Sequence, residues 1–189
     1  FRTLTAVDSV IVVIDVAKGV EPQTEKLVEV CRMRNIPMLV FINKLDREGK
    51  DAFELLDEVE QKLKINVRPM SWPIGMGKRF KGVYNLYENN LSLFSGSDKQ
   101  RKEDTVDIES LEDERVNELV GEEAANTLRE EVELVEGVYS KLDMQDYMDA
   151  KVAPVFFGSA LNMFGVREML DCFVDIAPSP RGMETEERA

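Results

Sequence analysis

Two short runs of apolar residues without alternation constrain the fold of this chain more than any other feature. Residues 9–15 read SVIVVID and residues 37–42 read PMLVFI. A strand with one exposed face alternates apolar and polar residues, whereas a parallel strand covered by helices on both faces is apolar throughout. Both runs are therefore predicted to be central strands of a parallel sheet.

The segments that follow these two runs have the apolar spacing of amphipathic helices. Glu21-Pro22 opens the first helix, because proline suits a first helical position where no backbone donor is needed, and this helix should end near Asn35. The second is predicted over residues 51–64. An order of strand, helix, strand and helix favours right-handed parallel crossovers. The sequence thus predicts an α/β fold in which a parallel sheet is flanked by helices.

A third apolar run lies far along the chain, at residues 152–157, and is predicted to join the same sheet. It is followed by a tight turn at Gly158-Ser159-Ala160 and by a closing helix over residues 163–176.

The residues between the second helix and the third strand differ in character. Residues 66–74 and 82–94 are rich in aromatic and β-branched residues and are punctuated by proline and glycine, which predicts a small antiparallel element. Residues 96–118 are strongly charged and are predicted to form a solvated loop, whereas residues 122–142 carry a helical apolar stripe. We interpret this segment as an inserted α+β subdomain.

These observations divide the chain into four parts. Residues 1–64 and 152–177 are predicted to form one domain, residues 65–151 the inserted subdomain, and residues 178–189 a linker to a further domain. Because Phe1 enters a helical pattern without an initiator methionine, we expect the chain to be a piece of a longer protein.

Composition narrows the possible functions. The net charge of −13 repels phosphate backbones, so direct nucleic-acid binding is not expected. Histidine, the commonest general base and metal ligand, does not occur, and we assign no catalytic residue and no metal ligand. The longest apolar run, residues 10–14, is too short to cross a bilayer, so the expected location is cytoplasmic without membrane contact.

Asn43-Lys44-Leu45-Asp46 follows the second strand directly, at the end of a parallel sheet where ligands of open α/β folds bind. A carboxylate such as that of Asp46 can accept two parallel hydrogen bonds, and guanine presents a matching pair of donors that adenine lacks. Asn43 can donate to a purine nitrogen, and the stem of Lys44 can cover the flat face of the base. The alternative is an ordinary turn that caps the next helix.

Gly158-Ser159-Ala160-Leu161 follows the third strand in the same way, and its small residues would let backbone N–H groups approach a carbonyl oxygen closely. An ordinary strand-to-helix turn is again the alternative. Two such loops at the ends of strands in one sheet favour guanine binding. By contrast, Gly75-Met76-Gly77-Lys78 lacks the upstream glycine and the following serine or threonine of a phosphate loop and is predicted to be a plain turn.

These residues carry a resemblance to the translational GTPases. Asn43 to Asp46 resembles their N-K-x-D motif, Gly158 to Leu161 is similar to their S-A-L/K motif, and Asp15 to Thr24 resembles the segment after switch II. Within that family, Trp72 to Gly75 and Phe80 to Tyr84 resemble the release factor three branch, and the elongation factor G branch is the nearest alternative.

The resemblance implies that this is part of a P-loop GTPase-type domain with an inserted subdomain. It implies guanine-base contacts by Asn43, Lys44, Asp46, Ser159, Ala160 and Leu161. The phosphate loop, the switch I threonine and the D-x-x-G-H motif would precede Phe1, so magnesium would be bound by residues outside this chain, which is expected to be inactive alone. The parent would bind GTP and GDP, hydrolyse GTP on the ribosome and promote the departure of class I release factors in translation termination.

Two further expectations stay open at this point. An acidic protein-interaction module with an α/β fold and no bound nucleotide is the alternative from a different functional class. If strands before Ser9 are missing, an unpaired sheet edge and open apolar surface would favour self-association.

Overall fold

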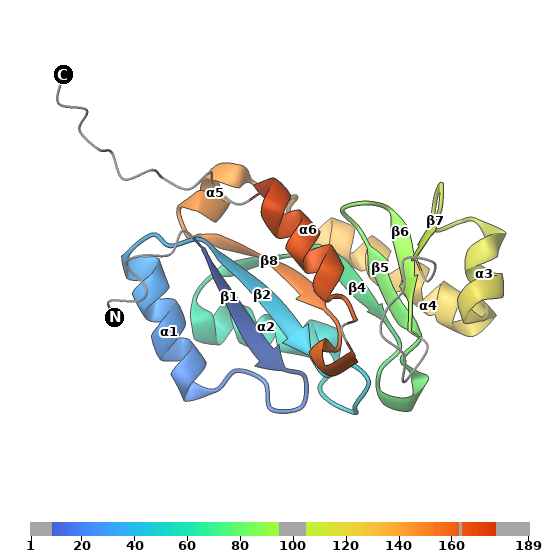
Figure 1. Ribbon diagram of the computed structural model, residues 1–189, viewed down its shortest axis with the longest axis horizontal. Coiled ribbons are helices and arrows are strands. Elements are labelled where there is room, and N and C mark those ends of the chain that lie inside the picture. Colours follow the sequence, from blue (N-terminus) through green and yellow to red (C-terminus); the bar gives the residue numbers. More distant parts are fainter. Residues whose placement is uncertain (1–8, 95–104, 163, 177–189) are drawn as a thin grey trace, which may run out of the picture.

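The structure, a computed structural model, describes residues 9–94, 105–162 and 164–176 (Figure 1). The first sheet has the strand order β1-β2-β8-β3, and its three pairings are all parallel. Its strands are β1 (Val10–Asp15), β2 (Met38–Asn43), β8 (Val152–Phe157) and β3 (Asn66–Pro69). The predicted parallel sheet flanked by helices is confirmed. The prediction that residues 9–15 form a central strand is wrong for the described sheet, because β1 lies at its edge and the Val13 side chain is 55% exposed.

Helices lie on both faces of this sheet, which explains the unbroken apolar run of β2. Val40 and Ile42 of β2 belong to the core shared with α1 (Pro22–Met33) and α2 (Ala52–Leu63). Leu39 and Phe41, which point the other way, pack in a second core with α5 (Met144–Met148) and α6 (Val166–Ile176). In Figure 1, α6 crosses in front of the sheet and α2 lies behind it.

Local signals begin and end the two early helices where the sequence predicts. Pro22 occupies the first turn of α1. The side chain of Asp51 accepts the N–H groups of Phe53 and Glu54 at the start of α2, and Lys64 ends that helix in the left-handed region at a φ of 54°. The later helices are shorter than predicted: α4 ends at Val138 where the prediction ran to residue 142, and α6 begins at Val166 where the prediction began at residue 163.

A second sheet is antiparallel, with the order β4-β5-β6-β7. Its strands are β4 (Ser71–Ile74), β5 (Gly82–Asn85), β6 (Asn90–Leu93) and β7 (Thr105–Asp107). A 3₁₀ turn, η2 (Gly77–Arg79), lies between β4 and β5, and α4 (Glu122–Val138) contacts β4. This sheet lies beside the first one, with α3 (Glu114–Val120) at its far end (Figure 1).

Two predictions for this middle region are corrected. Residues 66–69 were expected in the antiparallel element, but they form β3, which pairs in parallel with β8 from Asn66↔Val152 to Pro69↔Val155. Residues 96–118 were expected to form a solvated loop; residues 96–104 lie outside the described residues, but residues 105–118 contain β7 and most of α3, whose Val116 is fully buried. Val116 and Val120 lie on one face of a short helix, and the many charges around them hide that spacing.

Trp72 of β4 joins the two sheets. Its ring is fully buried and lies 4.6 Å from the ring of Phe53 in α2 and 5.5 Å from that of Phe157 in β8, as measured between centroids. Its indole N–H donates to the carboxylate of Glu131 on α4. One side chain therefore contacts the first sheet, a helix that covers it and the helix of the second sheet.

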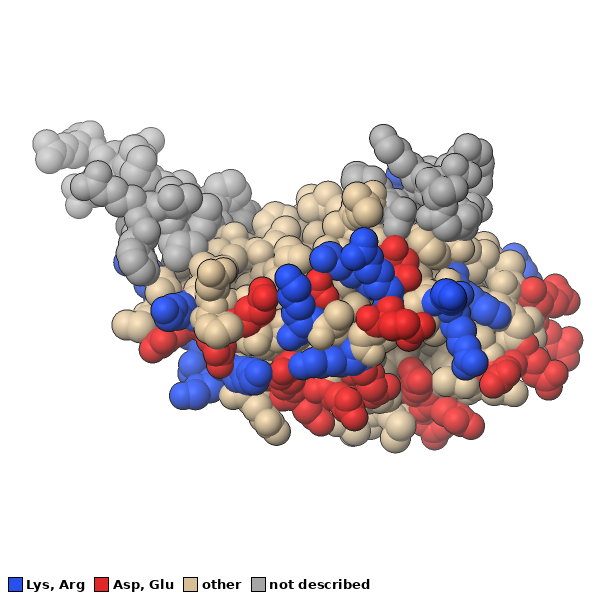
Figure 2. Space-filling view, turned by 90° about the horizontal axis from the view of Figure 1, so that it is seen from below, with Lys and Arg blue, Asp and Glu red and all other residues tan. Residues whose placement is uncertain are grey.

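Charged side chains of both signs lie close together on the face shown in Figure 2.

Among the described residues, none of the helices has both the length and the hydropathy needed to cross a membrane. The described part of the chain likewise contains no cluster of three or more histidine, cysteine or carboxylate side chains arranged to hold a metal ion.

Candidate functional site

The two predicted base-binding loops leave the first sheet side by side. Asn43 ends β2, and Gly158 follows the last residue of β8. These strands are direct neighbours, and Ile42 pairs with Phe157 at their ends. Because both strands run in the same direction, the loops emerge from the same edge of the sheet.

Hydrogen bonds join the loops into one unit. The side-chain oxygen Oδ1 of Asn43 accepts the N–H of Ala160 at 2.8 Å and that of Lys44 at 2.9 Å. The N–H of Leu45 donates to the carbonyl of Gly158 at 3.1 Å. The two loops therefore lie together, joined by the side chain of Asn43 and by the backbone bond from Leu45 to Gly158.

The second loop has a tight backbone geometry. A Cβ atom at Gly158 would overlap the carbonyl oxygen of Phe164 and lie 2.9 Å from the ring of Phe41, so only glycine fits there. Ser159 is buried and exchanges two backbone hydrogen bonds of 2.9 Å each with Phe164. The predicted closing helix does not start here: the 3₁₀ turn η4 (Ala160–Asn162) comes first, and Met163 lies outside the described residues.

The backbone donors predicted for a carbonyl oxygen are already engaged within the protein. The N–H of Ser159 donates to Phe164 and that of Ala160 donates to Asn43. A purine carbonyl that accepted the Ala160 N–H would have to share it with Asn43 in a three-centre bond. The Leu161 side chain is 84% exposed, so the burial of its own apolar surface does not hold the loop in place.

Lys44 adopts a left-handed backbone conformation, with a φ of 70°. For a residue other than glycine this conformation is unfavourable and persists only when the surroundings hold it. Its ammonium nitrogen Nζ forms an ion pair of 2.8 Å with Oδ2 of Asp15, which ends β1 opposite Asn43. The ion pair draws the Lys44 side chain across the end of the sheet toward β1.

Sequence reasoning did not assign Asp15 to the site. Its Oδ1 accepts the N–H groups of Ala17 and Lys18 at 2.8 and 3.2 Å. The hydrogen bond from Lys44, with help from these N–H groups, holds the pKa of the Asp15 carboxyl below its ordinary value, although partial burial opposes the shift. A signal was present in the sequence, because Asp15 and Asn43 are the polar residues that end the two apolar runs.

The lowered pKa of Asp15 predicts a pH dependence of folding. A carboxyl with a depressed folded-state pKa adds stability above its unfolded-state pKa of about 3.9, and this stability is lost as the pH falls through the folded-state value. Asp15→Asn should therefore be less stable than the wild type near neutral pH, and the difference should shrink between about pH 5 and pH 3. Urea unfolding at a series of pH values measures this, with the exposed Asp171→Asn as control. A constant difference over that range would contradict the assigned ion pair.

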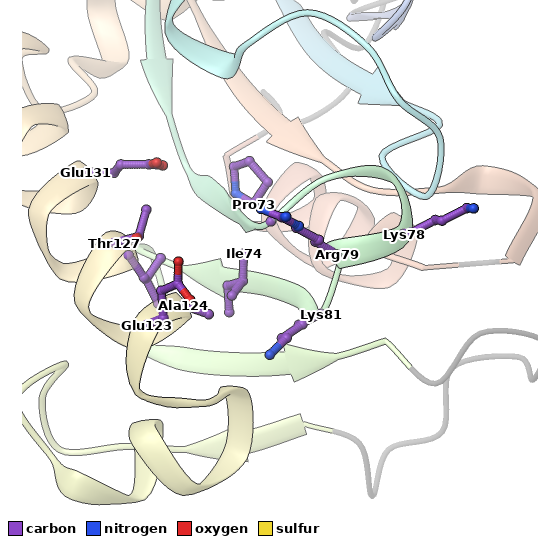
Figure 3. A pocket seen from close by; sticks show the side chains of 11 residues that line it. Pro73, Ile74, Lys78, Arg79, Lys81, Glu123, Ala124, Thr127 and Glu131 are labelled. Atoms are coloured by element: carbon purple, nitrogen blue, oxygen red, sulfur yellow. The ribbon is translucent and has the colours of Figure 1, made fainter.

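A cavity of about 470 Å³ lies elsewhere, between the β4–β5 segment and α4 (Figure 3). Arg79 and Lys81 line one side of it, and Glu123, Thr127 and Glu131 line the other. None of the predicted base-contacting residues lines this cavity. The Gly75–Lys78 segment beside it forms a turn, as predicted, with Gly75 and Gly77 at φ values of 74° and 63°.

A comparison with protein families agrees with this arrangement of strands and loops. Residues 1–179 match the family described as the Elongation factor Tu GTP binding domain. The chain therefore belongs to this family, and its parallel sheet is that of a translational GTPase G domain. A guanine nucleotide is the ligand that the family description names.

Proposed function

We propose that Asn43, Lys44, Asp46, Ser159, Ala160 and Leu161 bind the guanine base of GTP and GDP. The observation that carries this proposal is the 2.8 Å hydrogen bond from Ala160 to Asn43, which unites two loops of the expected composition at neighbouring strand ends. Membership of a GTP-binding family supports the same ligand and favours it over an acidic interaction module without a nucleotide.

The three residues of the first loop have distinct roles in this proposal. The carboxylate of Asp46 accepts the ring N–H and the exocyclic amine of guanine, a donor pair that adenine cannot offer. The Lys44 stem covers one face of the base while its ammonium group stays paired with Asp15. Asn43 uses its amide oxygen to hold the second loop, which leaves its amide nitrogen as the donor to the base.

The longer parent protein, in our proposal, is a cytoplasmic GTPase that hydrolyses GTP on the ribosome. It resembles release factor three, which promotes the departure of class I release factors, and the segments 72–75 and 80–84 support this choice. The elongation factor G branch is equally compatible with the family match. In either case the phosphate and magnesium contacts would come from outside this chain, and hydrolysis would need them.

The division into domain parts is also a proposal. We propose that residues 65–151 are an insertion between residues 1–64 and 152–177, and that β3 is the part of it that joins the first sheet. The proposed linker, residues 178–189, lies outside the described residues. Self-association stays a prediction, for which β1 as an edge strand of the described sheet supplies the surface.

Competition binding tests the base assignment. GDP, IDP and ADP should be titrated against a fluorescent GDP analogue bound to the natural full-length protein. Two charge-assisted hydrogen bonds of roughly 1.5 to 3 kcal/mol each predict that GDP binds about a hundredfold to ten-thousandfold more tightly than ADP. IDP, which lacks the exocyclic amine, should fall between them. Equal affinity for GDP and ADP would overturn the proposal.

A second measurement separates the two branches of the family. In the release factor three assignment, the full-length protein with GTP should accelerate dissociation of a class I release factor from ribosomes after peptide release. Acceleration of translocation instead, with no effect on release-factor dissociation, would assign the protein to the elongation factor G branch.

A further inference from the structure

The second sheet contacts the first base loop directly. The N–H of Gly77, in the turn between β4 and β5, donates to the carbonyl of Leu45 at 2.9 Å. Leu45 is fully buried and lies between Lys44 and Asp46, the two residues proposed to contact the base. This bond therefore holds the backbone of Leu45, and the position of that backbone determines where the side chains of Lys44 and Asp46 begin.

The second base loop is held by the same sheet through aromatic contacts. The rings of Phe80 and Phe94 lie edge-on to the ring of Phe164, with centroid distances of 5.5 and 5.3 Å. Phe164 is buried and exchanges both backbone hydrogen bonds with Ser159. Aromatic pairs of this geometry contribute beyond the area they bury, so the second sheet determines where Ser159 lies.

The strand that leads into the second loop is also held from this side. The hydroxyl oxygen of Ser71 in β4 accepts the N–H of Phe157, the last residue of β8, at 2.9 Å in a buried position. Four contacts thus run from the β4–β5 segment and from Phe94, which follows β6, to the end of β8 and to the segments that follow β2 and β8.

These contacts matter because the loops are not held by local structure alone. Lys44 is in a conformation that costs about 1 to 2 kcal/mol for a residue other than glycine, and such a residue relaxes when its surroundings give way. Small displacements of hydrogen-bonding groups from a ligand are costly, since those bonds weaken steeply with distance and angle.

We propose that Gly77 and Phe80, which lie in the connection between β4 and β5, are positioning residues for the guanine site: they hold the two base loops in binding geometry without touching the nucleotide themselves. This inference rests on the proposed guanine binding. Since equilibrium coupling between two sites is reciprocal, a partner that shifts the β4–β5 segment changes nucleotide affinity, and the nucleotide changes affinity for that partner.

Gly77→Ala and Phe80→Leu test the inference. Alanine at position 77 would have to adopt an unfavourable φ of 63°. The Glu48 carboxylate that its Cβ would meet is exposed and can turn away, so the backbone strain is what shifts the turn. Leucine at position 80 removes the ring that contacts Phe164 but stays apolar and buried. In the full-length protein, each change should weaken GDP binding about tenfold.

Three control variants separate positioning from general destabilisation. Leu91→Ala removes a fully buried side chain from the middle of the second sheet, where Leu91 pairs with Tyr84 and Val106. Gly121→Ala places a side chain on a backbone with a positive φ, as Gly77→Ala does, but at a position where its Cβ would meet only the Lys81 side chain. Arg79→Ala removes a side chain of the β4–β5 segment that lines the cavity. These should leave the GDP dissociation constant within about twofold, even where thermal unfolding shows equal loss of stability.

A base-specific readout completes the test. If the loops are displaced, the hydrogen bond from the exocyclic amine of guanine to the Asp46 carboxylate is lost. The preference for GDP over IDP should therefore fall in Gly77→Ala and Phe80→Leu and stay constant in the controls. Unchanged affinity and preference in both variants would overturn the positioning role while leaving guanine binding intact. A wild-type protein that fails to distinguish GDP from ADP would instead overturn the proposed function, and this inference with it.

Discussion

Asp46→Asn should lower the affinity for GDP by about a hundredfold to ten-thousandfold and make XDP the better ligand. The carboxylate can accept from both donors of guanine, whereas a carboxamide can accept only one and presents an N–H group where the amine of guanine would clash. Xanthine carries a carbonyl in place of that amine, so the carboxamide restores the match. The half-buried position of Asp46, directly after buried Leu45, lets asparagine occupy the same place.

Equilibrium titration of the full-length variant with GDP and XDP measures this exchange. Glu48→Gln is the matched control, since it also neutralises a carboxylate on the same loop, but at an exposed position two residues further on. The control should bind GDP as the wild type does. An Asp46→Asn variant with unchanged GDP preference would show that another group reads the base.

Trp72→Ala should destabilise the fold by about 3 to 5 kcal/mol, the range typical of deleting a buried large aromatic side chain. Trp72 is fully buried between the rings of Phe53 and Phe157, so its removal opens a cavity between the two sheets. It also leaves Glu131 without its indole donor, and burial already raises the pKa of that carboxyl. Urea unfolding followed by circular dichroism suits this variant, because Trp72 is the single tryptophan of the chain.

Two further variants provide reference values for the loss of unfolding free energy in Trp72→Ala. Tyr87→Ala removes an aromatic ring that is 44% exposed and should cost much less than Trp72→Ala. Trp72→Phe keeps a ring in the cavity but not the N–H donor and should lie between the wild type and the alanine variant. Equal costs for Trp72→Ala and Tyr87→Ala would show that the ring does not join the sheets.

Sequence patterns predicted the parallel sheet because a strand that is buried on both faces is apolar at every position. Each residue of β2 from Met38 to Ile42 is buried, with alternate side chains in two different cores. An unbroken apolar run is the pattern that this environment requires. The positions of the two loops could be predicted for the same reason, since polar and small residues directly follow such strands, whereas their role in base binding stays a prediction.

The patterns failed where an element is short or where its partner is distant in the chain. β3 has four residues, too few for periodicity to separate a parallel from an antiparallel partner, and its pairing is set by Val152 to Val155. The ion pair of Lys44 with Asp15 and the bond from Gly77 to Leu45 likewise join segments that no local spacing connects.

The α/β class, the positions of the apolar strands β1, β2 and β8, and the residue types of the loops follow from the amino-acid sequence alone, because apolar patterns and residue type reflect the local environment of each position. The place of β1 at the edge of the described sheet and the groups that hold the loops depend on how distant segments pack. Asn43 joins the loops, Asp15 pairs with Lys44, and Gly77 and Phe80 contact the loop segments from the connection between β4 and β5. These contacts are set by distances between segments far apart in the chain, and such distances exist only once the two sheets have packed around Trp72.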